Sequence, residues 1–211
     1  DPFEHLAVID SGDCFLDVHN PLTIHGAIVD HARHILASGA RMLTFGGDHS
    51  ISYPLLQAHV EKTGAPLSLI HFDAHCDTWP DDSLASLNHG SMFYKAVREG
   101  LIDVKRSVQI GIRTWNDDFM GINILDADRI HRQGTDAVVA EIERIVGTQP
   151  AYLTFDIDCL DPAYAPGTGT PVCGGLSTAQ ALAIIRGLTA INLIGMDIVE
   201  VSPPYDHSQI T

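Results

Sequence analysis

Three short apolar segments of this chain each run directly into a cluster of aspartate and histidine. Residues 42–45 precede Gly-Gly-Asp-His-Ser, residues 67–72 precede Asp-Ala-His-Cys-Asp, and residues 151–155 precede Asp-Ile-Asp-Cys-Leu-Asp-Pro. Such nearly continuous apolar runs are typical of central strands in a parallel sheet, because both faces of that sheet are covered. Functional side chains of open α/β sheets gather where the strands end. The chain is therefore predicted to bring its charged residues together at one edge of a parallel sheet.

Apolar runs alternate with helical patterns along the chain, which predicts an α/β fold with a mostly parallel central sheet. The predicted strands are residues 6–9, 42–45, 67–72, 107–111, 151–155 and 193–199, and the predicted helices are residues 21–38, 50–62, 91–100, 135–146 and 177–188. Helix starts are expected at Asn20-Pro21 and Ser177, and helix stops at Gly39, Gly64, Gly100, Gly147 and Gly187. Without an internal repeat or linker, residues 1–211 are expected to form a single domain.

The composition excludes several classes of function. The formal net charge is −15, which is the opposite of the basic surface that nucleic-acid binding requires and which also repels anionic membranes. The apolar runs are too short to cross a bilayer. The four cysteines lack C-x-x-C spacing and the chain has no signal-like start, so a cytoplasmic protein is expected. An acidic protein attracts cations, either metal ions or a positively charged small substrate.

The aspartates and histidines at the strand ends are the candidate metal ligands. In extended backbone, residues two apart point to the same side, so Asp73, His75 and Asp77 are expected to project together. Buried carboxylates at such a position repel one another strongly unless a cation lies among them. The complete candidate set is His49, Asp73, His75, Asp77, Asp156 and Asp158.

This ligand set indicates two metal ions rather than one. One ion rarely takes four carboxylates, whereas two ions that share bridging carboxylates would use all six side chains. Oxygen and nitrogen ligands without thiolate favour Mn²⁺ over a structural zinc site. A close pair of ions would activate water at neutral pH and hold the reacting centre. Two Mn²⁺ ions per chain are therefore the predicted cofactors.

These motifs, in this order and at this spacing, resemble the arginase/agmatinase (ureohydrolase) family. The Pro-Gly-Thr-Gly-Thr-Pro of residues 166–171 and the Gly-Met-Asp-Ile-Val-Glu-Val of residues 195–201 are similar to further family segments, and residues 71–75 and 88–94 look closest to bacterial agmatinases. The resemblance implies a three-layer α/β/α sandwich, hydrolysis of a guanidino group to urea and an amine, and a homotrimer or homohexamer. It also implies that the chain lacks outer segments that family members carry at both ends.

The resemblance further implies roles for individual residues. His49 and Asp77 would bind one ion and His75 and Asp158 the other, while Asp73 and Asp156 would bridge the two. His89 would shuttle protons and Glu200 would pair with the guanidinium. Chemistry supports both catalytic roles, because a carboxylate offers two oxygens to a guanidinium fork and histidine titrates near neutrality.

Agmatine is the expected substrate, a small cationic guanidino compound. Two polar positions that hold the amino-acid end of arginine in arginases are Ala85 and Leu87 here. An α-carboxylate would be left there without partners, at a cost of about 1–3 kcal/mol, and agmatine has no such carboxylate. The loop with Trp79, Asp81 and Asp82 is expected to contact the substrate tail.

Other functions remain open at this point. The nearest alternative is another ureohydrolase, such as a guanidinobutyrase acting on an acid-tailed substrate, and an arginase is less favoured. A dinuclear phosphoesterase is disfavoured because no Gly-Asn-His-Asp/Glu segment is present. A non-catalytic, metal-stabilised regulator is disfavoured because every ligand is intact. Away from the ligands, Asp48 and Asp161 are expected to hold backbone turns or to orient ligands, and His71 is expected to point away from Asp73.

Overall fold

The computed structural model describes residues 2–81 and 88–211 of the chain. Its centre is a six-stranded sheet in the order β1-β6-β5-β2-β3-β4, and every neighbouring pair of strands is parallel. The strands are β1 (Met42–Phe45), β2 (Ser68–Phe72), β3 (Val108–Ile110), β4 (Asn123–Leu125), β5 (Pro150–Asp156) and β6 (Asn192–Val199). The predicted parallel sheet is confirmed.

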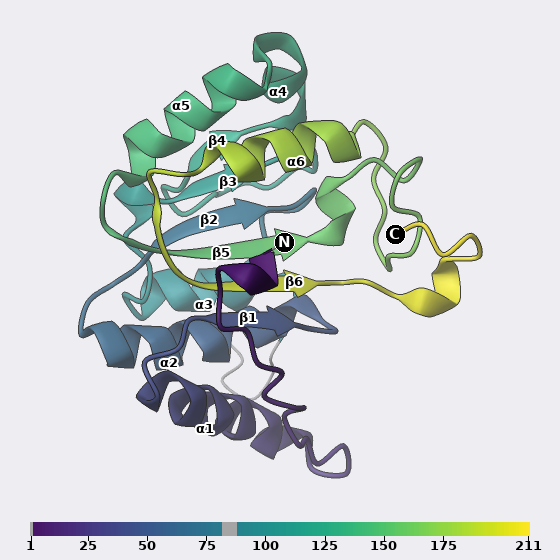
Figure 1. The fold of residues 1–211 in the computed structure, drawn as a ribbon. Helices are drawn as coiled ribbons and strands as arrows, with labels where there is room; N and C mark the ends of the chain where they lie inside the picture. Colours follow the sequence, from purple (N-terminus) through teal and green to yellow (C-terminus); the bar gives the residue numbers. More distant parts are fainter. Residues whose placement is uncertain (1, 82–87) are drawn as a thin grey trace.

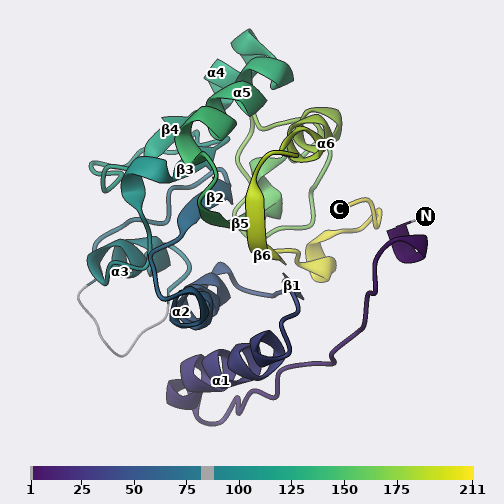
Figure 2. The same ribbon diagram turned by 60° about the vertical axis from the view of Figure 1, so that its left-hand side comes forward.

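Helices cover both faces of this sheet (Figures 1 and 2). On one side lie α1 (Ile24–Ala37), α2 (Ser52–Thr63) and α3 (Met92–Arg98), and on the other lie α4 (Ala127–Gln133), α5 (Thr135–Val146) and α6 (Thr178–Gly187). Each side has its own apolar core: Leu56 and Phe93 belong to one, and Ile142 and Ile184 to the other. None of the helices in the described part of the chain is long and apolar enough to cross a membrane. The fold is thus the expected three-layer α/β/α sandwich.

The sequence predicted most of these elements but not all of them. Five predicted strands are confirmed to within one residue at each end. The strand predicted at residues 6–9 is wrong: this segment has irregular backbone, and Ile9 is 82% exposed. In the described sheet no strand pairs with residues 6–9, so this apolar run forms no ladder. The three-residue β4 and the seven-residue α4 were not predicted, because elements this short carry little periodic signal.

The helix ends agree with the predicted caps in most places. Ser177 forms a capping box with Gln180 at the start of α6. Asn20 makes no side-chain cap, and Pro21 instead begins a short 3₁₀ turn before α1. Four predicted stops have positive φ angles at helix ends: Gly39, Gly64, Gly100 and Gly147. The helix also ends at the predicted Gly187, but this glycine has no positive φ, and an added Cβ would lie 2.7 Å from Val139 of α5.

Parallel strands all point their carboxyl ends to the same edge of the sheet, and that edge carries the candidate ligands. The segment after β3 packs against the backbone of one of these ligands. Gly111 has a φ of +94°, and a Cβ added there would lie 3.0 Å from the backbone oxygen of Asp73. The backbone at Asp73 therefore depends on the absence of a side chain at Gly111.

A matched pair of substitutions tests this close approach. Gly111→Ala and Gly121→Ala both place alanine at positive φ (+94° and +80°), but the nearest atom to the new Cβ at Gly121 is a Val104 carbon at 3.9 Å. We expect Gly121→Ala to lower the free energy of unfolding by about 1–2 kcal/mol, and Gly111→Ala to lower it further. Urea denaturation measures both. Equal losses would contradict the role given to Gly111.

Candidate metal centre

The segment after β1 buries the first candidate ligand. The chain turns into a short 3₁₀ helix (His49–Ile51), and the Asp48 side chain caps it by accepting from the Ser50 N–H at 2.9 Å. His49 is completely buried. A Cβ at Gly46 would overlap the end of the Ile51 side chain and lie 3.0 Å from Val199, so a side chain there would require both to move. The prediction that Asp48 holds a turn is confirmed.

The segment after β2 contributes a group of three candidate ligands. The strand ends at Phe72, and Asp73 follows with Oδ1 accepting from the His75 N–H at 2.6 Å. Asp77 has a positive φ of 53°. The expected strand alternation is therefore wrong here, although the three side chains still converge, because a turn rather than extended backbone brings them together. A non-glycine residue in this strained conformation is often found at a functional site.

The segment after β5 turns in a similar way. Asp156 caps a short 3₁₀ helix (Ile157–Cys159) by accepting from the Asp158 N–H at 2.8 Å. Asp158 Oδ1 accepts from the Ala74 N–H at 3.0 Å, and its Oδ2 accepts from the Thr170 hydroxyl at 3.1 Å. These bonds join the exit of β5 to that of β2 and to the loop at residues 166–171.

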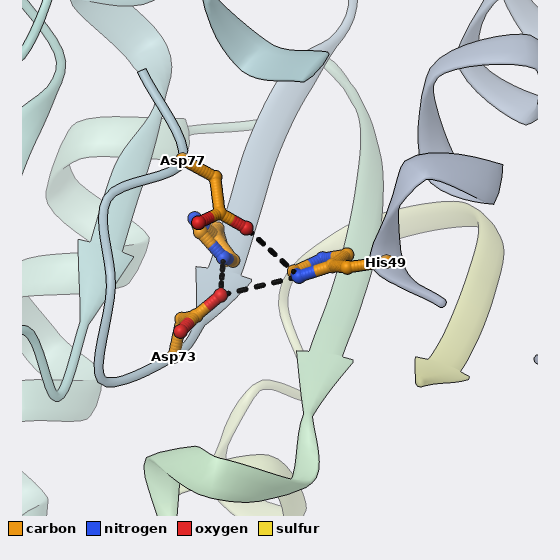
Figure 3. Close-up of side chains that lie close together, drawn as sticks. His49, Asp73 and Asp77 are labelled. Atoms are coloured by element: carbon orange, nitrogen blue, oxygen red, sulfur yellow. Dashed lines mark hydrogen bonds and ion pairs between the residues drawn. The ribbon is translucent and has the colours of Figure 1, made fainter. Parts of the chain in front are cut away.

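His49 Nδ1 faces three carboxylates at once. It lies 3.2 Å from Asp73 Oδ2, 3.1 Å from Asp77 Oδ2 and 3.2 Å from Asp156 Oδ2. Figure 3 shows Asp73 and Asp77 directed at the His49 ring. Despite these distances, Nδ1 makes no hydrogen bond to any residue that the structure describes. Two ligand atoms that are each about 2.1 Å from a shared ion lie about 3 Å apart when they meet at a right angle, so this spacing fits a cation between the four groups.

A second group of side chains shares Asp73 with the first. His75 Nδ1 lies 3.3 Å from Asp73 Oδ1 and 3.1 Å from Asp158 Oδ2. The two oxygens of Asp73 thus face different histidines, as expected of a carboxylate between two ions. Together the two groups form a buried histidine and aspartate cluster that is able to hold metal ions.

The proton affinities of these groups show how much positive charge the cluster requires. Burial alone would lower the pKa of His49, but the carboxylates of Asp156, Asp73 and Asp77 raise it well above its usual range. Burial and the charge of Asp73 raise the pKa of Asp77 to about 8. Burial opposes protonation of His75, yet the neighbouring carboxylates raise its pKa to about 10. Without a cation the cluster would hold protons instead, since so many carboxylates cannot stay charged together.

His71 does not point away from Asp73, contrary to the sequence-based expectation. Its Nε2 lies 2.6 Å from Asp73 Oδ2, as the two-residue periodicity of a strand requires. Gln109 Nε2 donates to the Cys76 carbonyl at 2.6 Å and lies 3.0 Å from His71 Nδ1. Because a carbonyl only accepts, the amide nitrogen faces Nδ1, and the His71 proton lies on Nε2. Both ring nitrogens are thereby engaged, so His71 orients Asp73 and is not free to act as a ligand.

Two further residues, the partly buried Arg113 and the buried Gln109, support the site and were not predicted. Arg113 donates to the carbonyl oxygens of Asp158, Leu160 and Val172 and so holds the chain after β5 in place. Gln109 is the other, and its only signal in the sequence is a lone amide inside an apolar strand. The expected turn at Asp161 is confirmed, since its carboxylate accepts from three backbone N–H groups.

His89 and Glu200 lie together at the open side of the cluster. His89 Nδ1 lies 3.7 Å from Glu200 Oε1 and 3.4 Å from Asp48 Oδ2. Glu200 follows β6 with a positive φ of 62°, and its Oε1 accepts from the His49 N–H at 2.6 Å. Burial raises the pKa of Glu200. Both residues line a cavity of about 560 Å³ that also reaches His49, and so connects them to the cluster.

The proposed tail loop is only partly described. Trp79 and Asp81 line the same cavity, and a Cβ on Gly90 would lie 3.2 Å from the Trp79 ring. Asp81 accepts from the Ser91 hydroxyl at 3.2 Å and lies 3.7 Å from Lys95 Nζ. The other residues used to predict the substrate lie outside the described residues: Asp82, Ala85 and Leu87.

The chain is similar to enzymes of one family along its whole length. The model of the Arginase family matches residues 1–211. An agmatinase of Chromobacterium violaceum is 70% identical over 211 residues, which are all of this chain and 66% of that protein. An agmatinase of Photorhabdus laumondii is 52% identical over 206 residues, 98% of this chain and again 66% of the relative. The chain thus spans about two thirds of the length of these relatives.

A solved structure leads to the same family. The crystal structure of a hypothetical agmatinase from Burkholderia thailandensis has 70% identity and a TM-score of 0.98, and the match covers all of this chain and 67% of that one. The sheet order, the buried ligand cluster and these likenesses lead to one conclusion. The chain belongs to the arginase family.

Proposed function

We propose that this protein hydrolyses the guanidino group of agmatine to putrescine and urea at a site that holds two Mn²⁺ ions. One observation carries the proposal: the two ligand groups share Asp73 and open into the cavity that contains His89 and Glu200. The relatives named agmatinase support the choice of substrate.

The residues present fit a pair of metal ions. His49 and Asp77 would hold one ion, His75 and Asp158 the other, and Asp73 and Asp156 both. The buried Nδ1 of His49 supports this assignment, because it makes no hydrogen bond among the described residues and faces three carboxylates with which it could share a cation. The oxygen and nitrogen donors suit Mn²⁺. When bound, the two ions would activate a water molecule and polarise the guanidino group.

The side chains at the mouth of the cavity would do the rest of the chemistry. Glu200 would hold the guanidinium, since one of its oxygens is already fixed by the His49 N–H and the carboxylate is thereby oriented. Water oxygen adds to the guanidino carbon, and the bond from that carbon to the chain nitrogen breaks. His89 would give the proton that the departing amine needs, because it lies beside Glu200 and is about half exposed.

Trp79 would contribute most to recognition of the substrate tail. Asp81 lies close to Lys95, so its charge is already partly compensated. The indole ring instead offers an apolar surface to the four-carbon chain and a π face to the distal ammonium. We therefore assign tail specificity chiefly to Trp79 rather than to the acidic residues of the loop.

The expectations about assembly and compartment are also proposals. We propose a homotrimer or homohexamer in the cytoplasm.

The substrate is tested by urea release with added Mn²⁺ from agmatine, 4-guanidinobutyrate and arginine. We expect kcat/KM to be at least about 10-fold higher for agmatine, because a carboxylate on the tail would be left without partners. A preference for 4-guanidinobutyrate would replace this function with that of a guanidinobutyrase. Bound Mn²⁺ without urea from any of the three would instead favour a metal-stabilised regulator.

Trp115 provides a matched control for the proposed contact of Trp79 with the substrate tail. Trp79→Ala is expected to raise the KM for agmatine about 3- to 30-fold, the range of a cation–π contact. Trp115→Ala removes an indole that is 82% exposed and does not line the cavity, and it should leave KM unchanged. If the two variants behave alike, Trp79 does not contact the tail.

His89 and Glu200 are expected to affect different kinetic constants. His89→Asn should lower kcat about 10²- to 10⁴-fold with little change in KM, because a proton donor acts in the transition state. Glu200→Gln should raise the KM for agmatine about 10- to 100-fold, since it removes a charge-assisted hydrogen bond. His34→Asn, on the exposed side of α1, is the control. Steady-state kinetics with agmatine measure all three, and the assignment is wrong if both site variants change the same constant.

A further inference from the structure

A chain of buried polar side chains runs behind His49, away from the candidate metal centre. His49 Nε2 lies 2.8 Å from the Thr154 hydroxyl, which lies 3.3 Å from the Ser52 hydroxyl. Ser52 donates to Asp197 Oδ2 at 2.8 Å. All four residues are completely buried. They come from the segment after β1, from β5, from the start of α2 and from β6.

Asp197 is an unusual residue for its position. It lies in the middle of β6, its side chain has no exposed surface, and its Oδ1 has no hydrogen-bond partner among the described residues. Its Oδ2 also accepts from the Tyr152 hydroxyl at 2.8 Å. A buried carboxylate in an apolar strand is costly. A carboxylate without solvent exposure at this position needs an explanation beyond packing.

The Asp197 carboxylate sets the direction of every hydrogen bond in this series of side chains. An ionised carboxylate only accepts, so the Ser52 proton points to Asp197. The Ser52 oxygen must then accept from Thr154, and the Thr154 oxygen must accept from His49. The His49 proton is thereby placed on Nε2. The Nδ1 lone pair is left facing Asp73, Asp77 and Asp156, where it could bind an ion.

We propose that Asp197 is a positioning residue that fixes the tautomer and the orientation of His49 through Ser52 and Thr154. The inference rests on the proposed metal function, and it extends that function to a residue that touches no ligand directly. Groups that hold the outer nitrogen of a metal-binding histidine commonly change metal affinity about 10- to 100-fold when removed. The same loss of metal affinity is expected when Ser52 loses its hydroxyl and the hydrogen-bond path from Asp197 to His49 is interrupted.

Two variants that each remove one hydroxyl donor from the same Asp197 oxygen separate this role from general stability. Ser52→Ala cuts the path from Asp197 to His49. Tyr152→Phe removes the other donor and leaves that path intact. Titration of the metal-free protein with Mn²⁺ in a calorimeter should give two sites for the wild type. Ser52→Ala should weaken one of them about 10- to 100-fold, while Tyr152→Phe leaves both within about two-fold of the wild type.

The outcomes distinguish this inference from the proposed function. If the wild type binds no Mn²⁺, the metal function itself is wrong. If the wild type binds two ions and the two variants lose affinity equally, or not at all, the role of Asp197 is wrong. Urea unfolding without metal shows whether each variant folds. Should Ser52→Ala fail to fold, Thr154→Val makes the same cut one hydrogen bond closer to His49, and the same loss at one site is expected.

Discussion

The crowding of buried carboxylates at one edge of the sheet is the constraint on which the rest of this structure depends. Asp73, Asp77, Asp156 and Asp158 are all at most 5% exposed, and two histidines lie among them. So much negative charge in a medium of low polarity is unstable without a positive charge at its centre. The elevated pKa of Asp77 and the three carboxylates around the His49 nitrogen are two consequences of the same crowding. A pair of cations relieves both.

The parallel sheet is what makes the crowding possible. Strands that point the same way end at one edge, so three segments far apart in sequence meet there, and the hydrogen bond from Ala74 to Asp158 joins two of them directly. The backbone is strained where it serves the site: Asp77 and Glu200 both have positive φ angles. Such strain costs about 1–3 kcal/mol for each residue, which the surrounding hydrogen bonds must offset. The fold therefore supplies rigidity at the positions where the proposed chemistry needs it.

The sequence predicted the features that depend on local patterns. The strand ends and their Asp and His motifs are contiguous, so the central strands and the convergence of the ligands could be read from them. The hydrogen bonds that support the ligands could not be predicted, because their partners are far apart in the sequence. Ser52 and Asp197 are 145 residues apart, and His49 and Thr154 are 105 residues apart. His71 was misjudged although strand periodicity already places it on the side of Asp73. The prediction of a strand at residues 6–9 was wrong, because apolar character alone does not show that a neighbouring strand is available for pairing.

The central claim is that two groups of ligands that share Asp73 hold two metal ions, and counting those ions tests it most directly. After equilibrium dialysis against Mn²⁺, metal analysis of the wild-type protein should give two ions per chain. Asp73→Asn should give fewer than one, because both groups lose the carboxylate they share. Asp136→Asn, the same change at an exposed position of α5, should retain two. Two ions bound to Asp73→Asn, or fewer than two bound to the wild type, would contradict the account.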